Sequence, residues 1–233
     1  MASGQDTARF GLGQRMEANP WHGLFDGPYQ AWPTYYEFVV SNVVYGAMED
    51  AWKELEGRLA AYRLVVPGTP TFICQPEVCT AHCCHAFSVN MGEGEAARMT
   101  RETGMQMVEF VELDDGEPVT LPMAQPYLLA RAEGQCRFLG EDLGCTVYSG
   151  RPNACRLYPH FVVFWDAEER RPLFAGKPEF AAAVEAVLAG NANSPLPLLL
   201  GHSECPGFTG PPLEESAWKS LLAETYHLQF DVL

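Results

Sequence analysis

The sequence predicts an α+β fold in which a long N-terminal helix precedes a small irregular sheet and a loop-rich core built around cysteines. Apolar residues recur at three- and four-residue steps over roughly residues 35–61, which is typical of an amphipathic helix. Short runs of alternating or β-branched residues further along the chain indicate strands. The eight cysteines lie in segments rich in glycine and proline. Because 47% of the 233 residues are hydrophobic, the chain can bury a core without metal or disulfides.

Residues 1–33 precede the long helix and follow neither a helical nor a strand period. Their aromatic residues are Trp21, Phe25, Tyr29 and Trp32. We expect this segment to be an extended arm that packs on the domain through its rings. Thr34 and Glu37 form a capping box, which predicts that the long helix begins just after Thr34. Residues 1–70 are thus expected to be the arm and the helix, and residues 71–233 the cysteine-bearing domain, within one compact unit.

The remaining elements follow from local patterns. Alternation and β-branching predict strands, whereas three- or four-residue steps flanked by Pro or Gly predict helices. The expected strands are residues 106–113, 127–132 and 161–166. The expected helices are residues 95–103, 178–190 and 213–226.

The chain is strongly acidic, with 30 acidic and 15 basic residues and a formal net charge of −15 at pH 7. Nucleic acids and anionic membranes are bound through Lys and Arg, so this charge disfavours both as partners. It either keeps the chain soluble or forms an acidic face that attracts metal cations or a basic protein, so a protein partner or protein substrate is expected. The first residues lack the basic start and apolar run of a signal peptide, and no apolar run is long enough to span a bilayer. We therefore expect a soluble, cytoplasmic protein.

Cysteine usage indicates metal chemistry, because thiols stay reduced in the cytoplasm and closely spaced cysteines there more often bind metal than form disulfides. The eight cysteines are Cys74, Cys79, Cys83, Cys84, Cys136, Cys145, Cys155 and Cys205. Short loop spacings allow a turn to aim several sulfurs at one point, which suits tetrahedral zinc or an iron–sulfur cluster. All eight are candidate metal ligands, filling either two four-cysteine sites or one site with thiols left over.

Other interpretations of these residues stay open at this point. A single cysteine can pack as a small buried hydrophobe. Each thiol could also pair in a disulfide, although vicinal Cys83 and Cys84 cannot readily bond to each other. Four histidines lie within five residues of a cysteine and are further candidate ligands: His82, His85, His160 and His202. A radical S-adenosylmethionine motif starting at Cys79 is excluded, because Ala86 stands where its third cysteine is required.

The second cysteine segment carries a recognisable series of short motifs. The elements CRFL, CTVY, RP and CRLYP occur in that order, and CPGF follows them; they lie at Cys136, Cys145, Arg151, Cys155 and Cys205. Together with the vicinal pair upstream, this series resembles the YkgJ-type CxxCxxCC family of zinc- or iron-chelating cysteine-cluster proteins. The resemblance extends over residues 72–208.

The first cysteine group departs from that family. Its gaps are four and three residues, where the family has two and two. Thr80 stands where the family often has Gly, and His85 where it often has Arg. The longer loop admits His82 or His85 as a ligand.

The resemblance implies metal binding and is consistent with three alternative functions. The first is an iron–sulfur protein, with a 4Fe-4S cluster favoured, in a redox or S-adenosylmethionine-linked role. The second is a zinc-stabilised structural or partner-recruiting protein. The third is a protein lysine methylase, because one branch of the family resembles the S-adenosylmethionine-dependent methylase of flagellin. Arg151 and Arg156 match the family's RP and CR positions, where they would either bind the cofactor or pair with carboxylates.

Overall fold

A computed structural model describes residues 42–123, 125–174 and 178–230, all of which belong to one compact unit, residues 38–233. The mixture of helices with small antiparallel sheets confirms the α+β fold class. The predicted aromatic arm and the capping box at Thr34 lie outside the described residues. The predicted boundary near residue 70 stays a prediction. No helix among the described residues is both long and apolar enough to cross a membrane.

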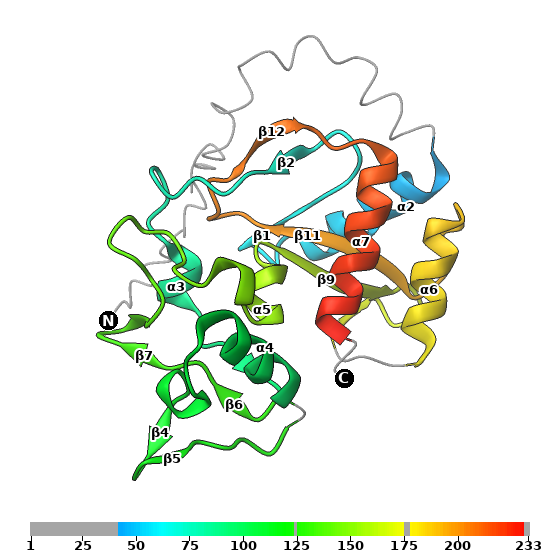
Figure 1. Cartoon of the computed structure of the whole chain (residues 1–233). Helices are drawn as coiled ribbons and strands as arrows, with labels where there is room; N and C mark the ends of the chain where they lie inside the picture. The colour runs from blue at the N-terminus through cyan, green and yellow to red at the C-terminus, as the bar shows by residue number, and fades with distance from the viewer. Residues whose placement is uncertain (1–41, 124, 175–177, 231–233) are drawn as a thin grey trace, which may run out of the picture. The chain divides into compact units, whose positions relative to one another are not determined.

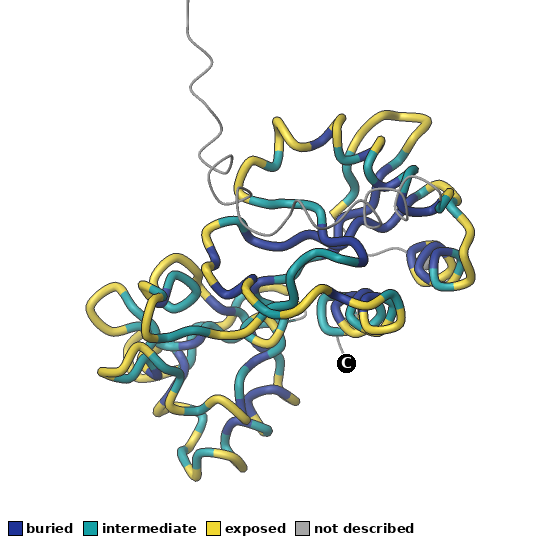
Figure 2. The backbone as a smooth tube through the Cα atoms, turned by 90° about the horizontal axis from the view of Figure 1, so that it is seen from above, coloured by how far each residue is buried: buried dark blue, intermediate teal, exposed yellow. Residues whose placement is uncertain are grey.

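A four-stranded antiparallel sheet forms the larger core, in the order β1-β11-β9-β10. Its strands are β1 (Tyr62–Leu64), β9 (His160–Asp166), β10 (Arg171–Leu173) and β11 (Leu196–His202). All seven residues of β11 are buried, as are the four central residues of β9. The sequence predicts β9 correctly and misses β11. Figure 2 shows the buried chain concentrated along this sheet.

Three helices pack against the sheet (Figure 1): α2 (Val43–Leu55) and α6 (Pro178–Leu188) contact β11, and α7 (Glu215–Phe230) contacts β9. Phe164 of β9 stacks on Phe180 of α6 with ring centroids 3.8 Å apart. The indole of Trp218 on α7 is fully buried and donates a hydrogen bond to the Val65 carbonyl at 2.7 Å. These contacts confirm the predicted C-terminal helices.

The long N-terminal helix is predicted too long at its C-terminal end. It ends at Leu55 rather than near residue 61, because a turn that includes Gly57 redirects the chain into β1. Its N-cap within the described residues is Asn42, whose side chain accepts a hydrogen bond from the Val44 N–H at 3.0 Å.

A second, smaller core supports the cysteine-bearing loops. Its helices are α3 (His82–Ala86), α4 (Glu93–Thr103) and α5 (Asn153–Leu157). Its strands form short antiparallel pairs: β3 (Asn90–Met91) with β6 (Tyr127–Leu128), β4 (Leu113–Asp114) with β5 (Glu117–Pro118), and β7 (Arg131–Ala132) with β8 (Gln135–Cys136). Buried Met91, Met99 and Phe110 form its centre, and Cys136 and Cys155 pack against it. A further pair, β2 (Pro70–Phe72) with β12 (Phe208–Pro212), instead packs on the large sheet, where the Phe72 and Phe208 rings contact His160 of β9.

Two strand predictions in this part are wrong in detail. Residues 106–113 form a 3-10 helix, η2 (Met107–Glu109), before the short β4, because the Glu109 carboxylate caps the Gln106 N–H and the fully buried Phe110 inserts into the small core. Residues 127–132 divide into β6 and β7, which pair with different partners. The helix predicted over residues 95–103 is α4, which begins two residues earlier.

Candidate metal centre

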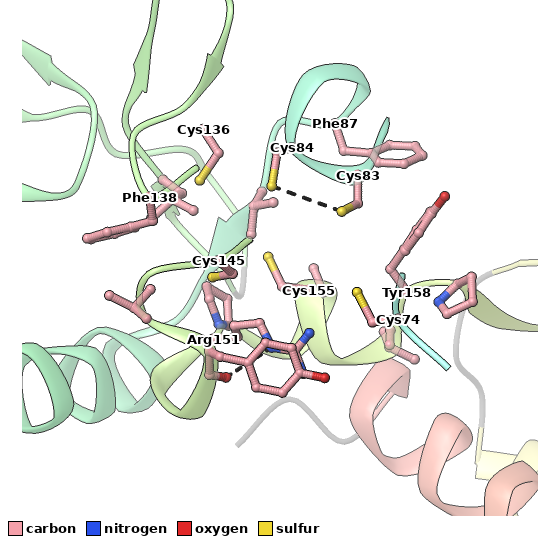
Figure 3. Close-up of a pocket in the computed structure, with 18 of the residues that line it drawn as sticks. Cys74, Cys83, Cys84, Phe87, Cys136, Phe138, Cys145, Arg151, Cys155 and Tyr158 are labelled. Atoms are coloured by element: carbon pink, nitrogen blue, oxygen red, sulfur yellow. Dashed lines mark hydrogen bonds between the residues drawn. The ribbon is translucent and has the colours of Figure 1, made fainter. Parts of the chain in front are cut away.

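Six of the eight cysteines line one cavity of about 580 Å³: Cys74, Cys83, Cys84, Cys136, Cys145 and Cys155. They come from separate parts of the chain. The loop after β2 supplies Cys74, α3 supplies the vicinal pair, β8 and the loop after it supply two thiols, and α5 supplies the sixth. The cavity lies where these loops meet the end of the large sheet, at Tyr62, His160 and His202. In Figure 3 the side chains of Cys84 and Cys155 point toward one another from opposite sides of this space.

The vicinal pair is held in a conformation compatible with a shared ion. Ala81 adopts a left-handed conformation, with φ 52° and ψ 40°, and this turn starts α3. The sulfurs of Cys83 and Cys84 then lie 4.0 Å apart. Two thiolates bound tetrahedrally to one zinc at about 2.3 Å have their sulfurs about 3.8 Å apart. The observed separation is close to that value.

The segment that carries Cys155 is anchored by α4, through residues that sequence reasoning missed. The buried Glu95 carboxylate accepts a hydrogen bond from the Asn153 N–H at 2.6 Å and from the Gly92 N–H at 2.9 Å. Arg98 donates to the Arg151 carbonyl at 2.9 Å and to the Asn153 side chain at 3.1 Å. The only indication in the sequence is that Glu95 occupies the third position of α4, where a glutamate can cap the helix.

Arg131 performs a similar role on the other side of the cavity. Its guanidinium donates to the carbonyl oxygens of Phe87 and Gly134, and to that of His85 at 2.7 Å. These bonds tie the C-terminal end of α3 to the turn between β7 and β8. The Cys83–Cys84 pair and Cys136 are thereby held next to each other.

The thiols perturb one another, which supports their grouping. Hydrogen bonding with Cys84 lowers the pKa of Cys83 and of Cys136, whereas the pKa of Cys84 is raised because it shares its proton with both. Burial raises the pKa of the Cys155 thiol to about 12. The Arg151 guanidinium acts in the opposite direction, lowering the pKa of the thiols that it faces. Since metals bind thiolates, occupation of this site would release protons.

The other predicted site residues are placed differently. Cys79 and Cys205 do not line the cavity. Arg151 does line it, with its guanidinium 3.6 Å from the centroid of the Tyr148 ring. Arg156 is outside the cavity lining and instead approaches Glu224 of α7 at 3.9 Å, so the structure favours the carboxylate-pairing alternative for this residue.

The thiols that line the cavity are suitable ligands for zinc or iron, because both metals bind thiolates. In the part of the chain that the structure describes, no three His, Cys, Asp or Glu side chains converge closely enough to be ligands of one ion. The assignment of individual ligands therefore stays a prediction.

The comparison with family models decides the class of this segment. Residues 73–181 match the model described as "CxxCxxCC: Putative zinc- or iron-chelating domain". This segment is similar to the CxxCxxCC domain, and it makes up slightly less than half of the chain. It contains seven of the eight cysteines and leaves only Cys205 outside. The match supports zinc or iron chelation and confirms the family resemblance drawn from the motifs. No match is found among curated proteins or among solved structures.

Proposed function

We propose that the chain is an iron–sulfur protein that holds its cluster in the six-thiol cavity and transfers electrons. The observation that carries this proposal is the combination of six thiols with a cavity of about 580 Å³. One zinc ion needs four ligands at about 2.3 Å and is closed over by them. An iron–sulfur cluster adds inorganic sulfide to its cysteine ligands and therefore needs more space.

The cysteines from α3, β8 and α5 would hold such a cluster, which when bound supplies one-electron redox chemistry. Arg151 places a positive charge near the thiols, and a nearby cation raises a cluster's reduction potential. The aromatic rings of Phe87, Phe138 and Tyr158 line the same cavity and give part of its wall an apolar surface. Arg151 is thus proposed as the residue that adjusts the potential.

An electron carrier needs a docking surface, and the loops around the cavity supply one. Exposed apolar side chains flank the cysteines, with Ile73 and Val78 in the first loop and Leu143 and Tyr148 in the second. We propose that a protein partner contacts this surface. The S-adenosylmethionine-linked role, the lysine methylase activity and the cytoplasmic location stay predictions.

The second candidate function is a zinc-stabilised structural protein. It is favoured by the 4.0 Å separation of the Cys83 and Cys84 sulfurs, which suits a single four-coordinate ion. In this case the metal would connect loops that have little regular structure of their own.

A pair of matched cysteine variants tests the cavity as the cluster site. The full-length chain is purified without oxygen, and iron and acid-labile sulfide are measured for Cys155→Ser and for Cys205→Ser. Cys155 lines the cavity and Cys205 does not, so we expect iron and sulfide to fall in the first variant and to be kept in the second. Equal iron content in both variants, or iron without sulfide in the parent chain, would contradict the proposal.

A further inference from the structure

The two cysteines that do not line the cavity share a sequence pattern. Cys79 begins the sequence CTAH, and Cys205 ends the sequence HSEC, so each has a histidine three residues away. These histidines are His82 and His202. A two-residue gap lets one turn present a thiol and an imidazole on the same side, as paired ligands do in zinc sites.

The fold brings these two segments together although they are far apart in the sequence. The rings of His82 and His202 have centroids 5.1 Å apart. Two imidazoles bound tetrahedrally to one zinc at about 2.0–2.1 Å have ring centroids about 5 Å apart. The Tyr158 ring packs against both histidines, and the Cys205 N–H donates a hydrogen bond to the His202 carbonyl at 3.1 Å, which closes the turn that carries this cysteine.

Both histidines have the hydrogen-bonding state expected of metal ligands. The Nδ1 atom of His82 lies 3.1 Å from a carboxylate oxygen of Glu204, which leaves Nε2 free to bind a cation. A carboxylate on the far nitrogen of a ligating histidine is the usual support of a zinc ligand. His202 is only 7% exposed, and its Nδ1 atom is buried with no hydrogen-bond partner among the described residues. An unsatisfied buried nitrogen is costly, and a metal bond would satisfy it.

We infer that Cys79, His82, His202 and Cys205 form a second metal site, which takes zinc and adjoins the six-thiol cavity at His202. Two thiolates and two imidazoles are a closed tetrahedral set that suits zinc. The four side chains are neighbours rather than a finished ligand set in this structure, so binding requires them to close on the ion. The zinc would join the loop before α3 to the turn between β11 and β12, and so fix the cavity's first cysteine loop to the large sheet. This role goes beyond electron transfer and does not depend on it.

Zinc content in matched variants of the full-length chain tests this site. We expect about one zinc per chain in the parent protein. The variant His82→Asn, at a residue outside the cavity lining, should lose the zinc and keep the iron and sulfide. His85→Asn is the control, because this exposed histidine lies on the same helix outside the pattern and should keep both metals. Cys155→Ser should show the reverse result, losing iron and keeping zinc.

These outcomes separate the two proposals. Absence of iron in every protein, with zinc lost only in the histidine variant, removes the proposed function and supports the second site. Zinc kept by the histidine variant, or lost equally in Cys155→Ser, would overturn the second site. Cobalt provides a check on the ligands, since Co²⁺ bound here should show intense tetrahedral and thiolate charge-transfer bands that Cys205→Ser weakens.

A second variant, Glu204→Gln, tests the same site if His82→Asn does not fold. The Glu204 side chain is 61% exposed, so its replacement leaves the fold intact. Loss of such a supporting carboxylate lowers zinc affinity roughly 10- to 100-fold, as measured by competition with a coloured chelator. Unchanged affinity in this variant would overturn the assignment of His82 as a ligand.

Discussion

The substitution Glu95→Gln tests how Cys155 is positioned without removing any proposed metal ligand. The buried Glu95 carboxylate accepts two backbone hydrogen bonds, from Asn153 at 2.6 Å and from Gly92 at 2.9 Å. A glutamine offers one accepting oxygen, and its amide N–H₂ would face the second backbone N–H. One charge-assisted bond worth about 1.5–3 kcal/mol is lost and a buried donor is left without a partner. We expect the free energy of unfolding to fall by about 2–3 kcal/mol.

Urea unfolding followed by tryptophan fluorescence measures this loss. With a slope of about 2 kcal/mol per molar urea, the midpoint should fall by about 1–1.5 M. Iron retention against a chelator should fall as well, because α5 loses the anchor that holds Cys155 in the cavity wall. Glu93→Gln is the matched control, because Glu93 lies two residues before Glu95 on the same helix and is exposed. Its replacement should change stability by less than about 0.5 kcal/mol. If Glu95→Gln shifted the midpoint no further than Glu93→Gln, the positioning argument would be refuted.

Three further predictions follow from the same geometry. Cys84→Ser should lose metal and stability together, because metal binding and folding are coupled; full metal content in this variant would remove the vicinal pair from the site. Arg131→Gln should speed iron loss to a chelator and cost about 1 kcal/mol of stability, because α3 loses its bonds to the β7–β8 turn; an unchanged rate of iron loss would show that the turn needs no such bonds. Burial, helped by Arg63, lowers the pKa of His160 to about 4, below the usual value near 6.5, so the unfolded chain binds the extra proton. Stability should therefore fall as the pH drops from 6.5 toward 4, by up to about 3 kcal/mol, and His160→Leu should flatten that part of the curve in unfolding experiments.

Elements with a local period could be predicted from the sequence, and elements defined by their partners could not. The helices α4, α6 and α7 carry their own helical steps, and β9 is marked by a run of β-branched and aromatic residues. The strand β11 has an unbroken apolar sequence with an internal proline, because both faces are covered, and such a run has no alternation to detect. The two-residue strands β3 to β8 are defined by their pairing, so the local pattern indicated a strand at residues 127–132 but not its division into β6 and β7.

The sequence also predicted the type of site, a cysteine metal centre, better than it predicted which cysteines line the cavity. Residue types and motif order indicate that the thiols bind metal, and the family match supports zinc or iron chelation. Linear spacing cannot show that Cys79 and Cys205 are outside the cavity lined by the other six, because that depends on how the β11–β12 turn meets the loop before α3. It cannot show the anchoring role of Glu95 either, since the Asn153 N–H that this carboxylate accepts is distant in the chain.

The central claim is that the six-thiol cavity holds an iron–sulfur cluster, and one measurement tests it most directly. The full-length chain is purified without oxygen, and its iron, zinc and acid-labile sulfide are counted per chain on the same sample. We predict about four irons with matching sulfide, in a coloured protein that a mild reductant bleaches. A colourless protein that contains zinc and no sulfide would contradict the claim and make the zinc-stabilised structural protein the correct account.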